Sequence, residues 1–298
     1  MNEPSIFDSE TVLPDQRLTL REAMLLGFDN RYAQVANQLR LLLNAGELEA
    51  WNKRFHDGRL ALSDLVADQY PLILFHGDVG TGKTVAAECM ANRIVRESRT
   101  EDSVLFKLST RVRGSGKVGE MGTLLAEAFR KVTESAGKGR RAILVIDEGD
   151  SLAAARSQEH SHHEDKVAVN TLIQGIDGLR RFQGRVVTFL CTNRLGAIDP
   201  ALHRRAAILQ EFQRPTPDER KQLFAMDLAS LELDPSQVKA LVDATGSREM
   251  GPPWTFSDIR TRLYPAAIAR AFPDSSLRID HLLAAAAELK PSPVLEDR

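Results

Sequence analysis

The chain has 298 residues, 43% of them hydrophobic, which suffices for a sizeable core and indicates two domains or one domain with a satellite. Its 39 basic and 41 acidic residues leave a formal net charge of -2, so the overall charge favours neither nucleic acid nor an anionic membrane surface as a partner. No apolar run reaches the ~18 residues of a membrane span, and the acidic start lacks a signal-peptide pattern, so we expect a cytoplasmic protein.

The N-terminal part carries the weakest pattern. Residues 1–30 combine charges with Pro4 and Pro14 and show little periodicity, which predicts either a poorly ordered arm or a strip that packs on another element. Apolar residues at helical spacing predict a helix over 31–43, and a second helix is predicted over 60–66.

The central block alternates short apolar runs with helical patterns. The runs predicted as strands are 72–75, 104–108, 142–146 and 186–190. The segments predicted as helices are 84–95, 122–132 and 167–176. Strands that alternate with helices form a parallel sheet with helices on both faces, so we predict an α/β fold with a doubly wound parallel sheet.

The pattern changes after Arg214. Pro215 and Pro217 interrupt it, and the stretches that follow are helical without a strand signal: 219–228, 237–244, 256–272 and 277–289. We therefore predict a small all-helical lid subdomain after the sheet. The predicted organisation is an N-terminal arm with helices, an α/β subdomain, the lid and a frayed tail, over 1–66, 67–214, 215–290 and 291–298.

A glycine-rich motif joins the first predicted strand of the central block to the helix after it. Its eight residues fit the pattern G-x-x-x-x-G-K-[ST]: Gly77, Asp78, Val79, Gly80, Thr81, Gly82, Lys83 and Thr84. The glycines let successive backbone N–H groups surround phosphates, and the helix that begins near Gly82 adds the positive end of its dipole. Lys83 then neutralises the β- and γ-phosphates, while the Thr84 hydroxyl binds Mg²⁺. The sequence therefore predicts a site for ATP and Mg²⁺.

Polar residues follow two further predicted strands. The run 142–146 leads directly into Asp147 and Glu148, and Asn193 follows the run 186–190. Ligands bind at the carboxyl edge of such sheets, which favours Asp147 as a second Mg²⁺ ligand and Glu148 as the general base for the attacking water. An amide at Asn193 could hold that water in line. The alternatives are a solvated turn for the acidic pair and an ordinary turn residue for Asn193.

With these motifs the sequence resembles the AAA+ ATPases over residues 32–272. In that resemblance 77–84 corresponds to Walker A, 147–150 to Walker B, and Asn193 to sensor 1. The stretch 195–206 is similar to the family segment that ends in arginine fingers, and its short HRRAA form most resembles the pachytene-checkpoint or thyroid-receptor-interactor branch. That branch remodels HORMA-domain proteins. The chain further resembles bacterial representatives that accompany HORMA proteins in antiphage (CBASS) operons built around nucleotide-second-messenger synthases.

The resemblance implies a ring, commonly a hexamer, in which Arg204 or Arg205 reaches the γ-phosphate held by the neighbouring subunit. An arginine supplied in trans stabilises the charge of the transition state and couples hydrolysis to assembly. The resemblance also implies a sensor 2 arginine in the lid, to which Arg260 is loosely matched. Two adjacent arginines taken alone are more often a solvated pair, but their place shortly after Asn193 favours a finger. The shortened motif leaves open which of the two it is.

The family's substrate-gripping pore loop corresponds here to 116–120, where Lys117 replaces the expected aromatic residue. Such a grip would depend on Val118 and on the lysine stem, which favours weaker or more polar contact with a peptide. An ordinary flexible glycine-rich loop is the alternative.

Two other sets of residues could be mistaken for metal or redox sites. The loop 157–165 contains three histidines, His160, His162 and His163. They have no fixed ligand geometry, so a solvated pore-side loop is favoured over a metal site. Cys89 and Cys191 lack ligand-like spacing, which predicts two small core residues.

Three hypotheses for function follow. The favoured one is an ATP-hydrolysing, ring-forming remodeller that partly unfolds or disassembles a protein partner, which the resemblance implies to be a HORMA-domain protein. The second is a nucleic-acid-handling AAA+ ATPase of the helicase or clamp loader type, with Arg111, Arg113 and Lys117 lining the pore; the near-neutral net charge argues against it. The third is a nucleotide-binding switch that barely hydrolyses, against which Glu148 and Asn193 weigh.

Overall fold

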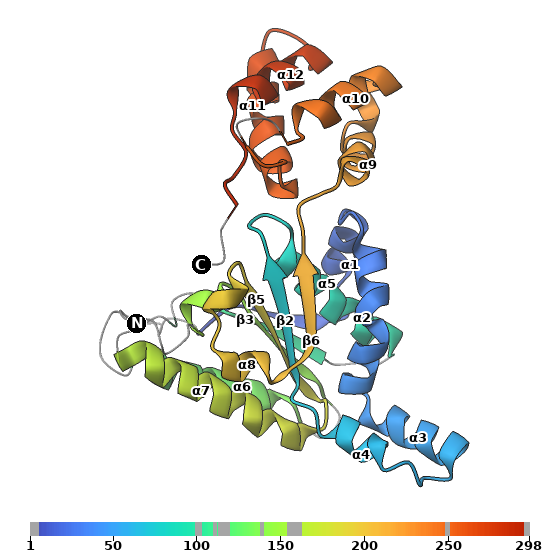
Figure 1. Cartoon of the computed structure of the whole chain (residues 1–298), viewed down its shortest axis with the longest axis vertical. Coiled ribbons are helices and arrows are strands. Elements are labelled where there is room, and N and C mark those ends of the chain that lie inside the picture. The colour runs from blue at the N-terminus through green and yellow to red at the C-terminus, as the bar shows by residue number, and fades with distance from the viewer. Residues whose placement is uncertain are drawn as a thin grey trace.

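A six-stranded sheet with helices on both faces forms the larger part of the protein, and helices of about the C-terminal quarter form a separate lid at one end (Figure 1). The computed structural model describes residues 6–98, 103–109, 112, 120–137, 140–153, 163–247 and 251–294, with the side chains of 163–165 excepted. Within these ranges no helix combines the length and the apolar character needed to cross a membrane.

The strands lie in the order β1-β3-β4-β5-β2-β6. They are β1 (Phe7–Leu13), β2 (Leu72–Gly77), β3 (Ser103–Leu108), β4 (Ala142–Ile146), β5 (Val186–Thr192) and β6 (Ala206–Phe212). The strands from β2 to β6 pair in parallel, and β1 pairs antiparallel with β3. The predicted doubly wound α/β fold is confirmed, with one antiparallel strand added at its edge.

The two strands that the sequence did not predict, β1 and β6, are the outer strands of the sheet. Strand β1 buries only its two ends, and β6 mixes buried with exposed residues. Either pattern gives a weaker signal than an unbroken apolar run. In the central strand β4, by contrast, Ala142, Leu144 and Ile146 pack into one core and Ile143 and Val145 into the other. Burial on both faces is the reason that this strand was predicted.

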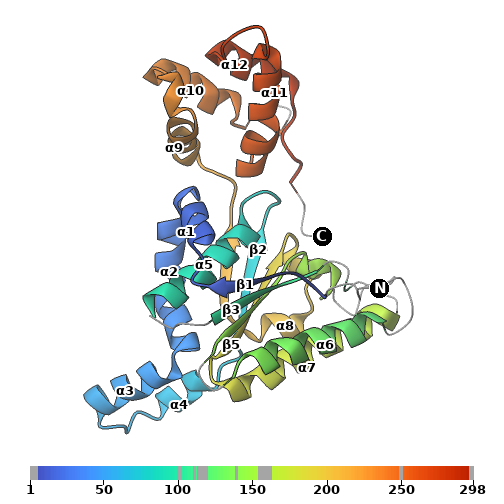
Figure 2. The ribbon, with the colours of Figure 1, turned by 180° about the vertical axis from the view of Figure 1, so that it is seen from behind.

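Helices cover the two faces of the sheet. One face packs against α6 (Glu120–Ser135) and α7 (His163–Leu179), and the other against α1 (Gln16–Ala23), α2 (Phe28–Leu43) and α5 (Lys83–Glu97) (Figure 2). The helices α3 (Ala45–His56) and α4 (Leu62–Ala67) lie at the end of the molecule opposite the lid (Figure 1). The helix α3 was not predicted, although Leu48, Trp51 and Phe55 recur at helical spacing; its buried residues are Leu48 and Asn52.

The expectation of a poorly ordered arm over 1–30 is wrong for the part that the structure describes. Strand β1 adds to the edge of the sheet, with Phe7 and Leu13 buried, and α1 packs on α5. The second alternative, a strip that packs on another element, is the one observed. Packing on α5, a helix far away in the sequence, leaves no local periodicity. The sequence could therefore not distinguish a poorly ordered arm from a packed strip.

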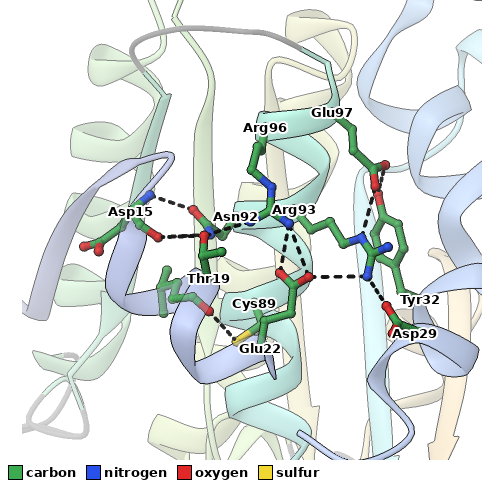
Figure 3. Close-up of polar contacts among 11 residues, drawn as sticks. Asp15, Thr19, Glu22, Asp29, Tyr32, Cys89, Asn92, Arg93, Arg96 and Glu97 are labelled. Atoms are coloured by element: carbon green, nitrogen blue, oxygen red, sulfur yellow. Dashed lines mark hydrogen bonds and ion pairs between the residues drawn. The ribbon is translucent and has the colours of Figure 1, made fainter. Parts of the chain in front are cut away.

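Polar contacts fasten this N-terminal segment to α5, the helix that follows the glycine-rich motif (Figure 3). The fully buried amide of Asn92 accepts from the backbone N–H of Asp15 at 2.7 Å and donates to its carbonyl at 3.1 Å. Arg96 donates to the Thr19 hydroxyl at 2.7 Å, and Arg93 forms an ion pair with Glu22 at 3.3 Å. A buried amide is costly unless it is paired, so these contacts hold the N-terminal segment in one position on α5.

The lid consists of α9 (Pro217–Asp227), α10 (Pro235–Ala244), α11 (Tyr264–Ala271) and α12 (Ile279–Glu288). It has a hydrophobic core of its own that includes the buried Trp254. Capping boxes at Thr216 and Asp234, each followed by proline, begin α9 and α10. A π-helical turn, Asp258–Leu263, precedes α11 within the predicted stretch 256–272. The elements that the structure describes in the lid are all helices, as predicted.

The expectation of a frayed tail over 291–298 is wrong for its first residues. The hydroxyl of Ser292 donates to Asp258 at 2.7 Å, and the carbonyls of Ser292 and Pro293 accept from Arg214 at 2.8 and 2.9 Å. These partners are separated by 34 to 79 residues in sequence, so local sequence could not reveal the contacts. Residues 295–298 lie outside the described ranges.

Replacing Gly77 with Ala is expected to lower the free energy of unfolding by more than about 2 kcal/mol. Gly77 has φ 130, and a Cβ there would lie 2.1 Å from the carbonyl oxygen of Phe212 in β6. Urea unfolding measures the effect. The control is Gly46→Ala in α3, where a Cβ meets no atom within 4 Å and helix propensity should leave stability equal or raise it by up to about 1 kcal/mol. Equal stability of the two variants would contradict this account.

Candidate active site

The glycine-rich motif forms the connection between β2 and α5. Gly77 ends β2 and Lys83 begins α5, so the N-terminus of a 15-residue helix faces the loop. Lys83 is 6% exposed as a residue, and its ammonium group donates to the carbonyls of Gly77 at 2.9 Å and Asp78 at 2.7 Å. Burial lowers the pKa of Lys83, although nearby groups such as Asp147 oppose the shift. The loop is therefore closed around Lys83 by these two hydrogen bonds, and Lys83 also lines the cleft described below.

The two carboxylates after β4 lie at the same edge of the sheet. Asp147 is half-buried and its Oδ1 accepts from the backbone N–H of Glu148 at 2.9 Å. Glu148 is exposed and adopts a left-handed conformation with φ 51 and ψ 45, which is uncommon for a residue other than glycine. This conformation turns the chain sharply after the strand, and the Glu148 carbonyl accepts from the Ser151 hydroxyl at 2.7 Å.

A hydrogen bond joins this turn to the end of β5. The Thr192 hydroxyl donates to Asp150 at 3.0 Å and accepts from the backbone N–H of Arg194 at 3.1 Å. Asn193 lies between Thr192 and Arg194 in the chain and is half-buried. Asp150, the fourth residue of the acidic motif, thus contacts the Thr192 side chain, which in turn accepts from the residue after Asn193.

One cleft of about 400 Å³ brings together most, but not all, of the predicted residues; Gly77, Asp78 and Thr81 are not in its lining. Its lining comes from the glycine-rich loop, from the ends of β4 and β5, and from the lid: Val79, Gly80, Gly82, Lys83, Thr84, Val85, Asp147, Glu148, Asn193, Phe256, Ser257, Arg260 and Thr261. The carboxyl ends of β4, β5 and β2 meet here because these strands are neighbours in the sheet. The Thr84 hydroxyl and the Asp147 carboxylate are oxygen donors of the kind that Mg²⁺ prefers.

The lid closes one side of the cleft. The backbone N–H of Ser257 donates to the Gly80 carbonyl at 3.1 Å, and a Cβ on Gly80 would lie 2.7 Å from Thr255 and from Ser257. Arg260 lines the cleft, but its guanidinium makes two hydrogen bonds of 2.8 Å with Asp227. Its role as sensor 2 therefore remains a prediction.

The two candidate finger arginines lie outside this cleft, near α8 (Pro200–His203) and the start of β6. Arg205 is bound within its own subunit, because its guanidinium makes hydrogen bonds of 2.6 and 2.9 Å with Asp177 and lies 5.1 Å from the ring centroid of Tyr70. Arg204 is exposed. Its Nε lies 3.4 Å from the Pro200 carbonyl, and the described part of the chain offers it no ion pair.

Sequence reasoning missed two features of the site. An apolar recess beside Gly82 is lined by Leu25, Leu26 and Phe28 from the N-terminal segment and by Phe256 from the lid. The second feature is a buried ion pair between Asp78 and Arg214. Neither set has a motif, and both depend on segments more than 50 residues apart, although an acidic residue inside the glycine-rich loop is a signal that calls for a partner.

Other predictions fall partly or wholly outside the described residues. The pore loop 116–120 is described from Glu120 on, and the histidines of 157–165 are not described beyond the backbone of His163. Over the part of the chain that is described, no three His, Cys, Asp or Glu side chains could hold a metal ion together. Both cysteines are buried and unbridged, as predicted. Burial raises the pKa of the Cys89 thiol to about 12, which fits a neutral core residue.

Comparison with known proteins gives consistent results. A family model described as ATPase family associated with various cellular activities (AAA) matches residues 73–214. A protein named CD-NTase-associated protein 6 from Escherichia coli (strain KTE188) is 64% identical over 100% of both chains. A second protein of that name, from Escherichia coli (strain MS 115-1), is 37% identical over 98% of this chain and 97% of the relative.

Solved structures agree with these relatives. A chain of the E. coli MS115-1 HORMA:CdnC:Trip13 complex is 35% identical, with a TM-score of 0.90 over 99% of this chain and 100% of the other. The structure of Rhizobiales Trip13 is 31% identical, with a TM-score of 0.72 over 96% and 99%. The chain therefore belongs to the AAA+ ATPases, in the Trip13-like branch that includes CD-NTase-associated protein 6. The family resemblance identified from the sequence is confirmed.

Proposed function

We propose that this protein is an ATP-hydrolysing, ring-forming remodeller that partly unfolds or disassembles a HORMA-domain protein in antiphage signalling. The observation that carries the proposal is the similarity, over 99% of the chain, to a chain of a complex that contains HORMA, CdnC and Trip13 proteins. The cleft supplies the chemistry, because the lysine and glycines of the loop, two carboxylates and an amide converge in it beside the helical lid.

ATP is the proposed substrate of the cleft. Its phosphates bind the backbone of 77–82, with Lys83 neutralising the β- and γ-phosphates. Its base lies in the apolar recess, whose Phe28 and Phe256 lie next to the loop. Thr84 and Asp147 would hold Mg²⁺, whose positive charge would offset that of the phosphates.

Hydrolysis needs a base and a means of orienting water. Glu148 accepts a proton from the attacking water, and its exposure beside Asp147 leaves its carboxylate accessible to that water. Asn193 orients the same water, with its backbone position maintained by the contact between Thr192 and Asp150. The neighbouring subunit supplies Arg204, which stabilises charge in the transition state.

Stimulation of ATPase turnover tests the proposed partner. We expect phosphate release by the wild-type protein to rise severalfold with the HORMA-domain protein of the same operon, and to stay unchanged with single-stranded DNA. Stimulation by DNA alone would instead favour the nucleic-acid-handling class. Absence of turnover under every condition, with ATP still bound, would favour the nucleotide-binding switch.

A further inference from the structure

A single buried arginine connects the glycine-rich loop, the lid and the C-terminal segment. Arg214 lies between β6 and α9, and its side chain is 7% exposed. It forms an ion pair with Asp78 and donates to the carbonyls of Pro253 at 2.7 Å, Ser292 at 2.8 Å and Pro293 at 2.9 Å. The planar guanidinium satisfies all of these acceptors at once, which the point charge of a lysine could not do.

The ion pair compensates an unfavourable charge. Asp78 is the second residue of the glycine-rich loop, and its carboxylate is 12% exposed. One oxygen accepts from the backbone N–H of Val79 at 2.9 Å, and the other pairs with Arg214. Without Arg214 a buried negative charge would remain beside the proposed polyphosphate site, where it would repel the ligand.

The C-terminal segment and the lid meet at the same point. Ser292 donates to the buried carboxylate of Asp258 through its hydroxyl at 2.7 Å and through its backbone N–H at 3.1 Å. Asp258 also accepts from the backbone N–H of Thr255 at 3.1 Å. Burial alone would raise the pKa of Asp258, but these hydrogen bonds hold it below its usual range. Thr255 belongs to the lid turn that contacts Gly80, so the contacts of Arg214 depend on where the lid lies.

We propose that Arg214 is a positioning residue that couples the position of the lid to the affinity of the glycine-rich loop for nucleotide. With the lid in the observed position, Arg214 neutralises Asp78 and keeps the loop receptive to phosphates. Movement of the lid and the C-terminal segment away from the loop removes three carbonyl acceptors from Arg214, which weakens its hold on Asp78 and favours nucleotide release. This inference rests on the proposed function, because it requires nucleotide to bind at the loop.

A double-mutant cycle on the full-length chain tests the coupling, with a fluorescent ATP analogue and Mg²⁺ as the probe. Arg214→Gln should weaken nucleotide affinity about tenfold or more, while Asp78→Asn should change it little alone and restore most of the loss when added to Arg214→Gln, which gives a coupling of about 1.4 kcal/mol or more. A purely structural role for Arg214 would lower the midpoint of thermal unfolding without coupling in affinity. Arg214→Lys should give an intermediate affinity, and this variant replaces Arg214→Gln in the cycle if Arg214→Gln does not fold.

Removal of the C-terminal segment tests the link to the lid. A chain that ends at Leu289 keeps every residue of the loop but loses Ser292 and Pro293, and it should release a fluorescent ADP severalfold faster than wild type. The matched control is Arg270→Gln, which breaks an ion pair with Glu288 inside the lid, away from the loop, and should release ADP at the wild-type rate.

Two results would overturn the inference, and they differ in what they say of the proposed function. If wild type binds nucleotide while Arg214→Gln binds it within about twofold of wild type, the inference fails and the function stands. If wild type binds no nucleotide, both fail.

Discussion

Replacing Glu148 with Gln is expected to lower ATP turnover at least about 100-fold while ATP affinity stays close to that of the wild type. Glutamine keeps the size of the side chain, but it cannot accept a proton from water. Binding should persist because Lys83, Thr84 and the loop backbone are unchanged. Steady-state phosphate release measures turnover, and a fluorescent ATP analogue measures binding.

The matched control for this variant is Glu49→Gln, which removes the same charge from an exposed position on α3. We expect the control to turn over ATP at the wild-type rate. If Glu148→Gln retained turnover within about twofold of wild type, a loss far below that expected for a general base, another residue would have to activate the water. The complex with the HORMA-domain protein should persist in Glu148→Gln, because ATP binding does not need the base.

Replacing Arg204 with Ala is expected to lower turnover about 1000-fold or more, the scale associated with an arginine supplied in trans. Arg204 is the better candidate of the pair because it is exposed, whereas Arg205 is bound to Asp177 at 2.6 and 2.9 Å. Affinity of each subunit for ATP should change little. The reverse result, full turnover in Arg204→Ala and none in a folded Arg205→Ala, would assign the finger to Arg205.

The two arginine variants should also differ in stability. Arg205→Ala leaves the Asp177 carboxylate without its partner and removes a contact with Tyr70, so its midpoint of thermal unfolding should fall, while that of Arg204→Ala should not. Mixing tests action in trans: subunits with Arg204→Ala and subunits with Glu148→Gln are each inactive alone. Their mixture should recover part of the activity, because an intact Glu148 site can then receive an intact Arg204 from its neighbour.

Much of the fold and of the candidate site could be predicted from short segments. The glycine-rich motif between a strand and a helix, and the acids after a buried strand, were recognisable because each places its chemistry at a fixed offset from one element. Strand β4 was predictable because both of its faces are buried. Strand β6 was not, because an outer strand with mixed burial lacks that signal.

The sequence by itself determined the class of fold, the phosphate-binding loop and the acids beside it, because hydrophobic period and motif spacing are local properties of a chain. The tertiary structure alone decided that the N-terminal segment joins the sheet and lines the apolar recess beside Gly82, and that Arg205 is bound within its subunit while Arg204 is exposed. It alone revealed Asp78 paired with Arg214, which lies 136 residues further along the chain. Contacts of that length are specified by packing of the whole molecule, and no local pattern encodes them.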